Sequence, residues 1–205
     1  MKGVILGGAL AMGMASAASA VTIANGSFEQ PGTFSGTFTN IPAGGVLPGW
    51  TVGGAGVDLI NTYWTAQDNN YSLDLSGTGA GTITQTITGM TVDQAYKVSF
   101  WMAGNPDRKS DPIKSLSAGI GMAGGGKFNF DVTNESRPNL SWEEMSFTFT
   151  AGATSGDLFF QSLEINAFGP ALDNISISAV PLPAGGLLLL GGLLGVGALR
   201  RTSRR

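Results

Sequence analysis

The sequence predicts an all-β protein, a jelly-roll sandwich of two antiparallel sheets, with a signal helix before it and a transmembrane helix after it. Short segments in which apolar and polar residues alternate recur along the chain, separated by Gly, Asn, Asp and Pro. Between the two apolar ends, no segment keeps a helical period for three turns. We therefore expect three parts: a signal peptide at residues 1–20, one β-sandwich domain at 21–179, and a membrane-spanning sorting segment at 180–205.

The expected strands place their apolar side chains on one face. In residues 96–105, the even positions from Tyr96 to Met102 are apolar, whereas Lys97 and Ser99 lie on the opposite face. Eight or so strands of this kind favour two packed sheets over a single sheet. The other expected strands lie at residues 71–77, 82–88, 115–124, 127–132, 143–151, 157–165 and 172–178.

The first twenty residues have the parts of a secretory signal. Lys2 precedes an apolar run at residues 3–15, and Ala18, Ser19 and Ala20 are the small residues that a signal peptidase requires. We expect the protein to be exported and residues 1–20 to be removed.

The C-terminal segment has the properties of a membrane span. No charged side chain occurs from Val180 to Leu199, and at ~1.5 Å per residue this run roughly matches a bilayer core of ~30 Å. Four of the last six residues are arginine, and basic flanks stay on the cytoplasmic side of a membrane. The alternative, a buried core helix, is disfavoured by the glycines and by these arginines.

The same segment reads "VPLPAGGLLLLGGLLGVGALRR" and resembles the VPLPA variant of the PEP-CTERM sorting signal. This resemblance implies recognition and cleavage by an exosortase of a Gram-negative bacterium, followed by release to, or attachment at, the cell surface. Whether the tail is removed or retained as a membrane anchor stays open at this point.

Five spaced motifs between the two ends carry a second resemblance: "NGSFE" at 25–29, "LPGW" at 47–50, "VDLINTYWTAQDNNYSLDLSG" at 57–77, "AGNPD" at 103–107 and "GPALDNISI" at 169–177. Together they resemble the choice-of-anchor C proteins of bacteria, which are similar to a domain family of plant cell-wall proteins with a galactose-binding-like jelly roll. The resemblance implies a non-catalytic, carbohydrate-associated protein of the cell surface or extracellular matrix.

Composition excludes several function classes. Without Lys2 and the four terminal arginines, six basic residues face fourteen acidic ones, a net charge of −8, so nucleic acid is not an expected partner. No histidine or cysteine occurs, which excludes Ser-His-Asp and Cys-His nucleophiles and most zinc sites. The neighbouring Glu143 and Glu144 point to opposite faces of a strand and cannot flank one glycosidic bond. We therefore expect no enzyme, and glycan hydrolysis is the less favoured alternative.

Glycan binding requires an aromatic face for the sugar ring and polar side chains for its hydroxyls. Trp101 lies opposite the core face of its strand, and Tyr63 and Trp64 lie in a polar loop with Asn61 and Asp68. These five residues are the predicted ligand-binding set, with extracellular polysaccharide as the partner. In the alternative, Trp64 closes one end of the sandwich, a loop covers Trp101, and the protein is a structural matrix component without a specific glycan.

A structural calcium ion is the last expectation. In residues 172–178, Asp173 alternates onto the same face as Ile175, the face expected to enter the core, where an isolated charge is costly. Galactose-binding-like sugar modules often hold calcium between a first-strand Glu and a final-strand Asp, which implies Glu29 and Asp173 as ligands. Backbone carbonyls near Asn25 and Ser27 would complete the oxygen shell. The alternative is a buried carboxylate that accepts backbone N–H hydrogen bonds.

Overall fold

A computed structural model describes residues 20–32, 34, 36–121 and 123–181. The predicted signal peptide, apart from Ala20, and the predicted tail, apart from Val180 and Pro181, lie outside these residues. Within the described ranges we find no helix with the length and apolar character needed to cross a bilayer. The described residues form twelve strands: β1 (Phe38–Ile41), β2 (Val46–Leu47), β3 (Trp50–Gly54), β4 (Val57–Ile60), β5 (Ser72–Asp74), β6 (Gly81–Thr88), β7 (Ala95–Gly104), β8 (Ile113–Ile120), β9 (Gly125–Asp131), β10 (Glu143–Thr150), β11 (Ser155–Ser162) and β12 (Pro170–Ala179).

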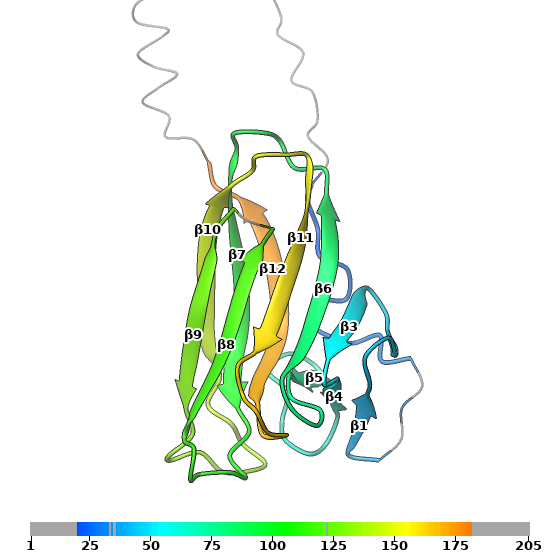
Figure 1. Ribbon diagram of the computed structural model, residues 1–205, viewed down its shortest axis with the longest axis vertical. Helices are drawn as coiled ribbons and strands as arrows, with labels where there is room; N and C mark the ends of the chain where they lie inside the picture. Colours follow the sequence, from blue (N-terminus) through cyan, green and yellow to red (C-terminus); the bar gives the residue numbers. More distant parts are fainter. Residues whose placement is uncertain (1–19, 33, 35, 122, 182–205) are drawn as a thin grey trace, which may run out of the picture.

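The strands form two antiparallel sheets that pack face to face (Figure 1). Within the described residues, the first sheet has the order β1-β4-β5-β12-β7-β10, and the second has the order β2-β3-β6-β11-β8-β9. The predicted all-β sandwich of two antiparallel sheets is confirmed. All eight expected strands are present, and β1 to β4 are additional.

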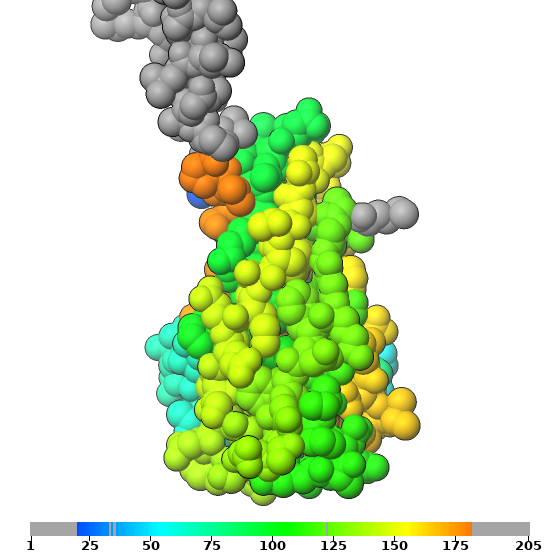
Figure 2. All heavy atoms as spheres, turned by 90° about the vertical axis from the view of Figure 1, so that its left-hand side faces the viewer, coloured from blue at the N-terminus to red at the C-terminus, as the bar shows by residue number. Residues whose placement is uncertain are grey.

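The core lies between the sheets and is formed by the inward rows of the long strands. The ring of Phe100 on β7 meets the rings of Phe128 and Phe160 on the second sheet edge to face, each at 5.0 Å between centroids. Phe100 and Phe160 are both fully buried, and burial of one such side chain stabilises the fold by ~1.5 to ~3 kcal/mol. The edge strands β9 and β10 contact each other, so the sheets meet along the side that Figure 2 presents.

The two ends of the sandwich differ in what they carry. Both described chain ends lie at one of them, where Ala20 and Ala179 line the same hollow and the Val180 N–H donates to the Ala95 carbonyl. At the opposite end, β7 finishes at Gly104, which pairs with Pro170 at the start of β12. The loops that follow β4 and β7 and precede β12 gather at this second end (Figure 1).

Candidate functional site

The loop between β4 and β5, residues 61–71, contains four of the five predicted ligand-binding residues. Trp64 anchors it: the indole is 1% exposed, and its Nε1–H donates to the Ser72 hydroxyl at 2.9 Å. A buried ring has no face to offer a sugar, so Trp64 does not fit its predicted role as a binding platform. Its indole belongs to the hydrophobic core, as the alternative interpretation expected.

Asp173 holds the same loop from the sheet below. Its Oδ2 accepts the backbone N–H groups of Gln67 and Asp68 at 2.8 and 2.9 Å, and its Oδ1 accepts that of Asn174 at 2.7 Å. Burial raises the pKa of Asp173 to about 7, against the opposing effect of these three donors. The carboxylate is therefore a structural clamp for the loop.

The expected orientation of Asp173 was wrong, and a β-bulge is the reason. The register of β12 against β7 shifts between Asp173 and Ser176, and Asn174 adopts a φ of 46°. A bulge adds one residue to a strand and reverses the alternation of faces beyond it. Asp173 pairs with Trp101, so it lies on the outer face of the first sheet, beneath the loop, and not between the sheets with the core.

The predicted calcium ligands Glu29, Asp173 and Asn25 hydrogen-bond to other parts of the fold. Glu29 Oε1 accepts the N–H groups of Asn70 and Tyr71 at 2.9 and 2.8 Å, so it clamps the loop as Asp173 does. The backbone carbonyl of Asn25, the predicted ligand atom, accepts the Trp50 Nε1–H at 3.0 Å, and the Asn25 side chain donates to the Pro48 carbonyl at 2.8 Å. Among the described residues, no group of three or more His, Cys, Asp or Glu side chains is placed to hold a metal ion.

Ser27, the fourth predicted ligand, is half-buried in the same N-terminal segment. This arrangement matches the alternative interpretation, a carboxylate that accepts backbone N–H groups, for both Glu29 and Asp173. Calcium binding itself stays a prediction of the sequence.

The remaining predicted ligand residues do not converge on one site. Trp101 is half-buried on the outer face of β7, between Glu144 on β10 and Asp173 on β12. Asn61 lines a separate hollow of about 250 Å³, and Asp68 is half-buried where its N–H meets Asp173. Tyr63 lies at neither place.

Tyr63 lines a cavity of about 260 Å³ at the end of the sandwich opposite the described chain ends, which we call the end cavity. Phe38 of β1 stands at its mouth, 43% exposed, and meets the Tyr63 ring edge to face at 5.3 Å. The guanidinium of Arg137 lies 4.0 Å from the centre of the Tyr63 ring and also donates to Asp107 at 2.9 Å. The Tyr63 hydroxyl donates to Asp107 as well. With Tyr63 occupied in this way, the exposed Phe38 and the half-buried Phe168 are the aromatic rings of the cavity with surface available to a ligand.

Sequence reasoning missed Phe38. The available signal was an aromatic residue and an amide two positions apart, Phe38 and Asn40, which share one face of a strand.

Two carboxylates line the end cavity. Asp58 on β4 and Asp74 on β5 are direct cross-strand partners. Asp58 Oδ1 accepts the Asn40 side-chain amide at 2.7 Å, and Asp74 Oδ2 accepts that of Asn105 at 2.9 Å. Asp74 Oδ1 also accepts the N–H groups of Ser76 and Gly169 at 2.9 and 3.1 Å.

Burial dominates the ionisation of both groups. It raises the pKa of Asp58 to about 6, while the Asn40 hydrogen bond acts in the opposite direction. It raises the pKa of Asp74 to about 8, and the charge of Asp58 adds to this effect. The cavity thus combines aromatic surface with carboxylate and amide groups, the combination that recognises a polyhydroxylated ring.

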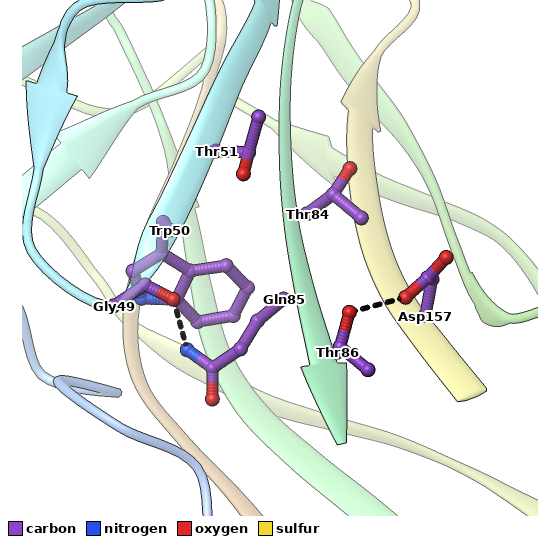
Figure 3. A pocket seen from close by; sticks show the side chains of 7 residues that line it. All are labelled: Gly49, Trp50, Thr51, Thr84, Gln85, Thr86 and Asp157. Atoms are coloured by element: carbon purple, nitrogen blue, oxygen red, sulfur yellow. Dashed lines mark hydrogen bonds between the residues drawn. The ribbon is translucent and has the colours of Figure 1, made fainter. Parts of the chain in front are cut away.

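A larger hollow of about 610 Å³ lies over β3, β6 and β11 on the second sheet (Figure 3). Its hydroxyl groups come from Thr51, Thr84 and Thr86, and Thr86 donates to Asp157 at 2.6 Å. Trp50 is the one aromatic residue among the described residues that line it, and it is 6% exposed. This hollow offers hydrogen bonds without an accessible aromatic face, so the end cavity is the stronger candidate for sugar binding.

Comparison with known proteins gives the family. The family model described as "Protein of unknown function (DUF642)" matches residues 21–178. The chain belongs to the DUF642 family. Among curated proteins, this DUF642 chain is similar to halomucin of Haloquadratum walsbyi, with 28% identity over 180 residues. The match covers 85% of this chain but only 2% of the length of halomucin.

Two solved structures are similar to the DUF642 chain at low sequence identity. TmCBM61, solved in complex with β-1,4-galactotriose, has a TM-score of 0.49 and 15% identity, over 76% of this chain and 96% of that chain. The CBM22-1 xylan-binding domain from Paenibacillus barcinonensis has a TM-score of 0.45 and 17% identity, over 65% of this chain and 87% of that chain.

Proposed function

We propose that this DUF642 protein is an exported, non-catalytic protein of the cell surface or extracellular matrix that binds a glycan in the end cavity. The observation that carries the proposal is the exposed Phe38 ring beside the Asn40 amide and the Asp58 carboxylate. A sugar ring stacks its apolar face on such a ring, while carboxylates and amides bind its hydroxyls. The volume of about 260 Å³ is slightly below the ~300 Å³ at which sites for drug-sized ligands begin, which suits one or two sugar units.

The position of the cavity supports this role. It opens at the end of the sandwich where β7 finishes, whereas Ala20 and Ala179 lie at the other end. A membrane segment attached after Ala179 would thus leave the cavity directed away from the membrane. This geometry suits the capture of an extracellular polysaccharide.

The test of glycan binding is a glycan array with the purified protein, followed by titration of the best ligand. Aromatic stacking contributes ~0.5 to ~1.5 kcal/mol, so we expect Phe38→Ala to weaken binding by up to about tenfold. Val46→Ala, which truncates a 78% exposed side chain on β2, is the matched control and should bind as the wild type does. If Trp101→Ala weakens binding and Phe38→Ala does not, the site lies on the outer face of the first sheet instead.

Export and sorting form a separate part of the proposal, supported by the sequence of the two ends. We propose that an exosortase recognises and cleaves the VPLPA-type tail and that the mature protein belongs to the envelope or matrix of a Gram-negative bacterium. Mass spectrometry of the protein recovered from cells decides this. A C-terminus that extends through Arg205 would contradict cleavage and leave a retained single-span anchor.

Two alternatives have distinct outcomes in these experiments. An array without any binding glycan would favour a structural matrix protein. Glycan hydrolysis is favoured by one observation, the Asp58–Asp74 pair with its raised pKa values in one cavity. Against it, both oxygens of Asp74 already accept N–H hydrogen bonds. Shortening of a bound oligosaccharide on prolonged incubation, lost in Asp58→Asn, would establish hydrolysis.

A further inference from the structure

We infer that the end cavity selects uncharged sugars and rejects uronic acids, an inference that rests on the proposed glycan binding. Asp58 carries it, because this carboxylate lines the cavity beside Asp74, its neighbour on the adjacent strand. Their hydrogen-bond partners within the fold are neutral: the amides of Asn40 and Asn105 and the backbone N–H groups of Ser76 and Gly169. Hydrogen bonds from these neutral groups leave the charge of Asp58 uncompensated, and Asp58 is the member of the pair with the lower pKa.

The nearby cations are engaged elsewhere. Among the described residues that line the cavity, none is Lys or Arg. Arg137, which covers the Tyr63 ring, pairs with Asp107 at 2.9 Å. The Lys114 ammonium donates to the Arg108 carbonyl, and the carboxylates that act on it are Glu164, Asp111 and Asp74, not Asp58. A ligand that enters the cavity therefore meets negative charge without a balancing cation.

This charge distinguishes two otherwise matched sugars. The C6 hydroxyl of a neutral hexose can donate a hydrogen bond to a carboxylate, whereas the ionised C6 carboxylate of a uronic acid can only accept one. It would face Asp58 as a like charge in a partly buried site, where such repulsion is screened far less than in water. The net charge of −8 between the two ends adds a repulsion of longer range that salt weakens.

The experiment is calorimetric titration at pH 7.5 and low salt with oligosaccharide pairs that differ only at C6: galactose and galacturonate oligomers, and glucose and glucuronate oligomers. We expect at least one neutral oligomer to bind at least tenfold more tightly than its uronate counterpart. Asp58→Asn should strengthen binding of the uronate and so reduce the ratio of neutral to uronate affinity at least threefold. Asp157→Asn removes one carboxylate from the hollow on the second sheet and is the matched control, so its ratio should stay at the wild-type value. Melting curves of both variants establish that they are folded.

Three other results would contradict the selectivity, the role of the cavity or the proposed function, respectively. Uronate oligomers that bind as tightly as the neutral ones would overturn the selectivity and leave glycan binding intact. Equal narrowing by Asp58→Asn and Asp157→Asn would assign the discrimination to overall charge and overturn the role of the cavity. If no oligomer of either kind binds and the glycan array is also silent, the proposed function fails, and the selectivity fails with it.

Discussion

Replacement of Trp64 by alanine tests whether this residue belongs to the core or to a binding surface. The indole is 1% exposed and bonds to a Ser72 hydroxyl that is itself fully buried. A Trp→Ala change in a core costs ~3 to ~5 kcal/mol, from lost burial and the cavity left behind. A domain of about 160 residues has an unfolding entropy of ~0.34 kcal/mol/K, from ~2.1 cal/mol/K per residue. A loss of ~4 kcal/mol therefore lowers the melting temperature by ~12 °C.

The assay is thermal unfolding by calorimetry of the wild type, Trp64→Ala and Trp64→Phe. The phenylalanine variant keeps most of the buried ring and loses the hydrogen bond to Ser72, so a smaller loss of ~1 to ~3 kcal/mol is expected. A Trp64→Ala protein that melts within ~3 °C of the wild type but no longer binds its glycan would refute the reasoning. Trp64 would then act as the exposed platform that the sequence predicted.

Three further measurements check the clamps and the buried acids. Burial raises the pKa of Asp74 to about 8 and that of Asp173 to about 7, above the unfolded value of 3.8. Between pH 3.8 and each raised pKa, the folded state therefore binds more protons than the unfolded state. The contribution of these two groups to the unfolding free energy is therefore greatest below about pH 4. It falls above that by up to ~1.4 kcal/mol per pH unit for each group and levels off above about pH 7 for Asp173 and pH 8 for Asp74. Higher stability at pH 8 than at pH 5 would contradict this. Calcium binding by Asp173 and Glu29 predicts a higher melting temperature with calcium than with a chelator. The same melting temperature in both would leave these two carboxylates as acceptors of backbone N–H groups. Gly26→Ala places a Cβ 2.1 Å from a carbonyl oxygen of β12 and should lower the melting temperature, whereas Gly152→Ala, with nothing within 4 Å, should not.

The long strands could be predicted from the sequence, and of the short ones only β5 could. In β7 and β10 one face packs in the core and the other faces outward, so the apolar residues alternate and the period identifies the strand. In β4, all four residues are buried, and Asp58 stands among three apolar residues. A strand that is buried on both faces does not need to alternate between apolar and polar residues. Which strands are covered on both faces is decided only when the chain has folded.

Composition and period fixed the sheet architecture and excluded histidine and cysteine chemistry, but they did not determine which aromatic residue is exposed. Trp64 and Phe38 both lie near polar residues in the sequence, yet the fold buries the first and exposes the second. The orientation of Asp173 depended on one bulge, which a pattern of period two does not reveal. Exposure and orientation are results of packing between segments far apart in the chain. The end cavity is such a result, because residues from β1, β4, β5 and four loops, near positions 63, 78, 105 and 168, meet only after the sheets have paired.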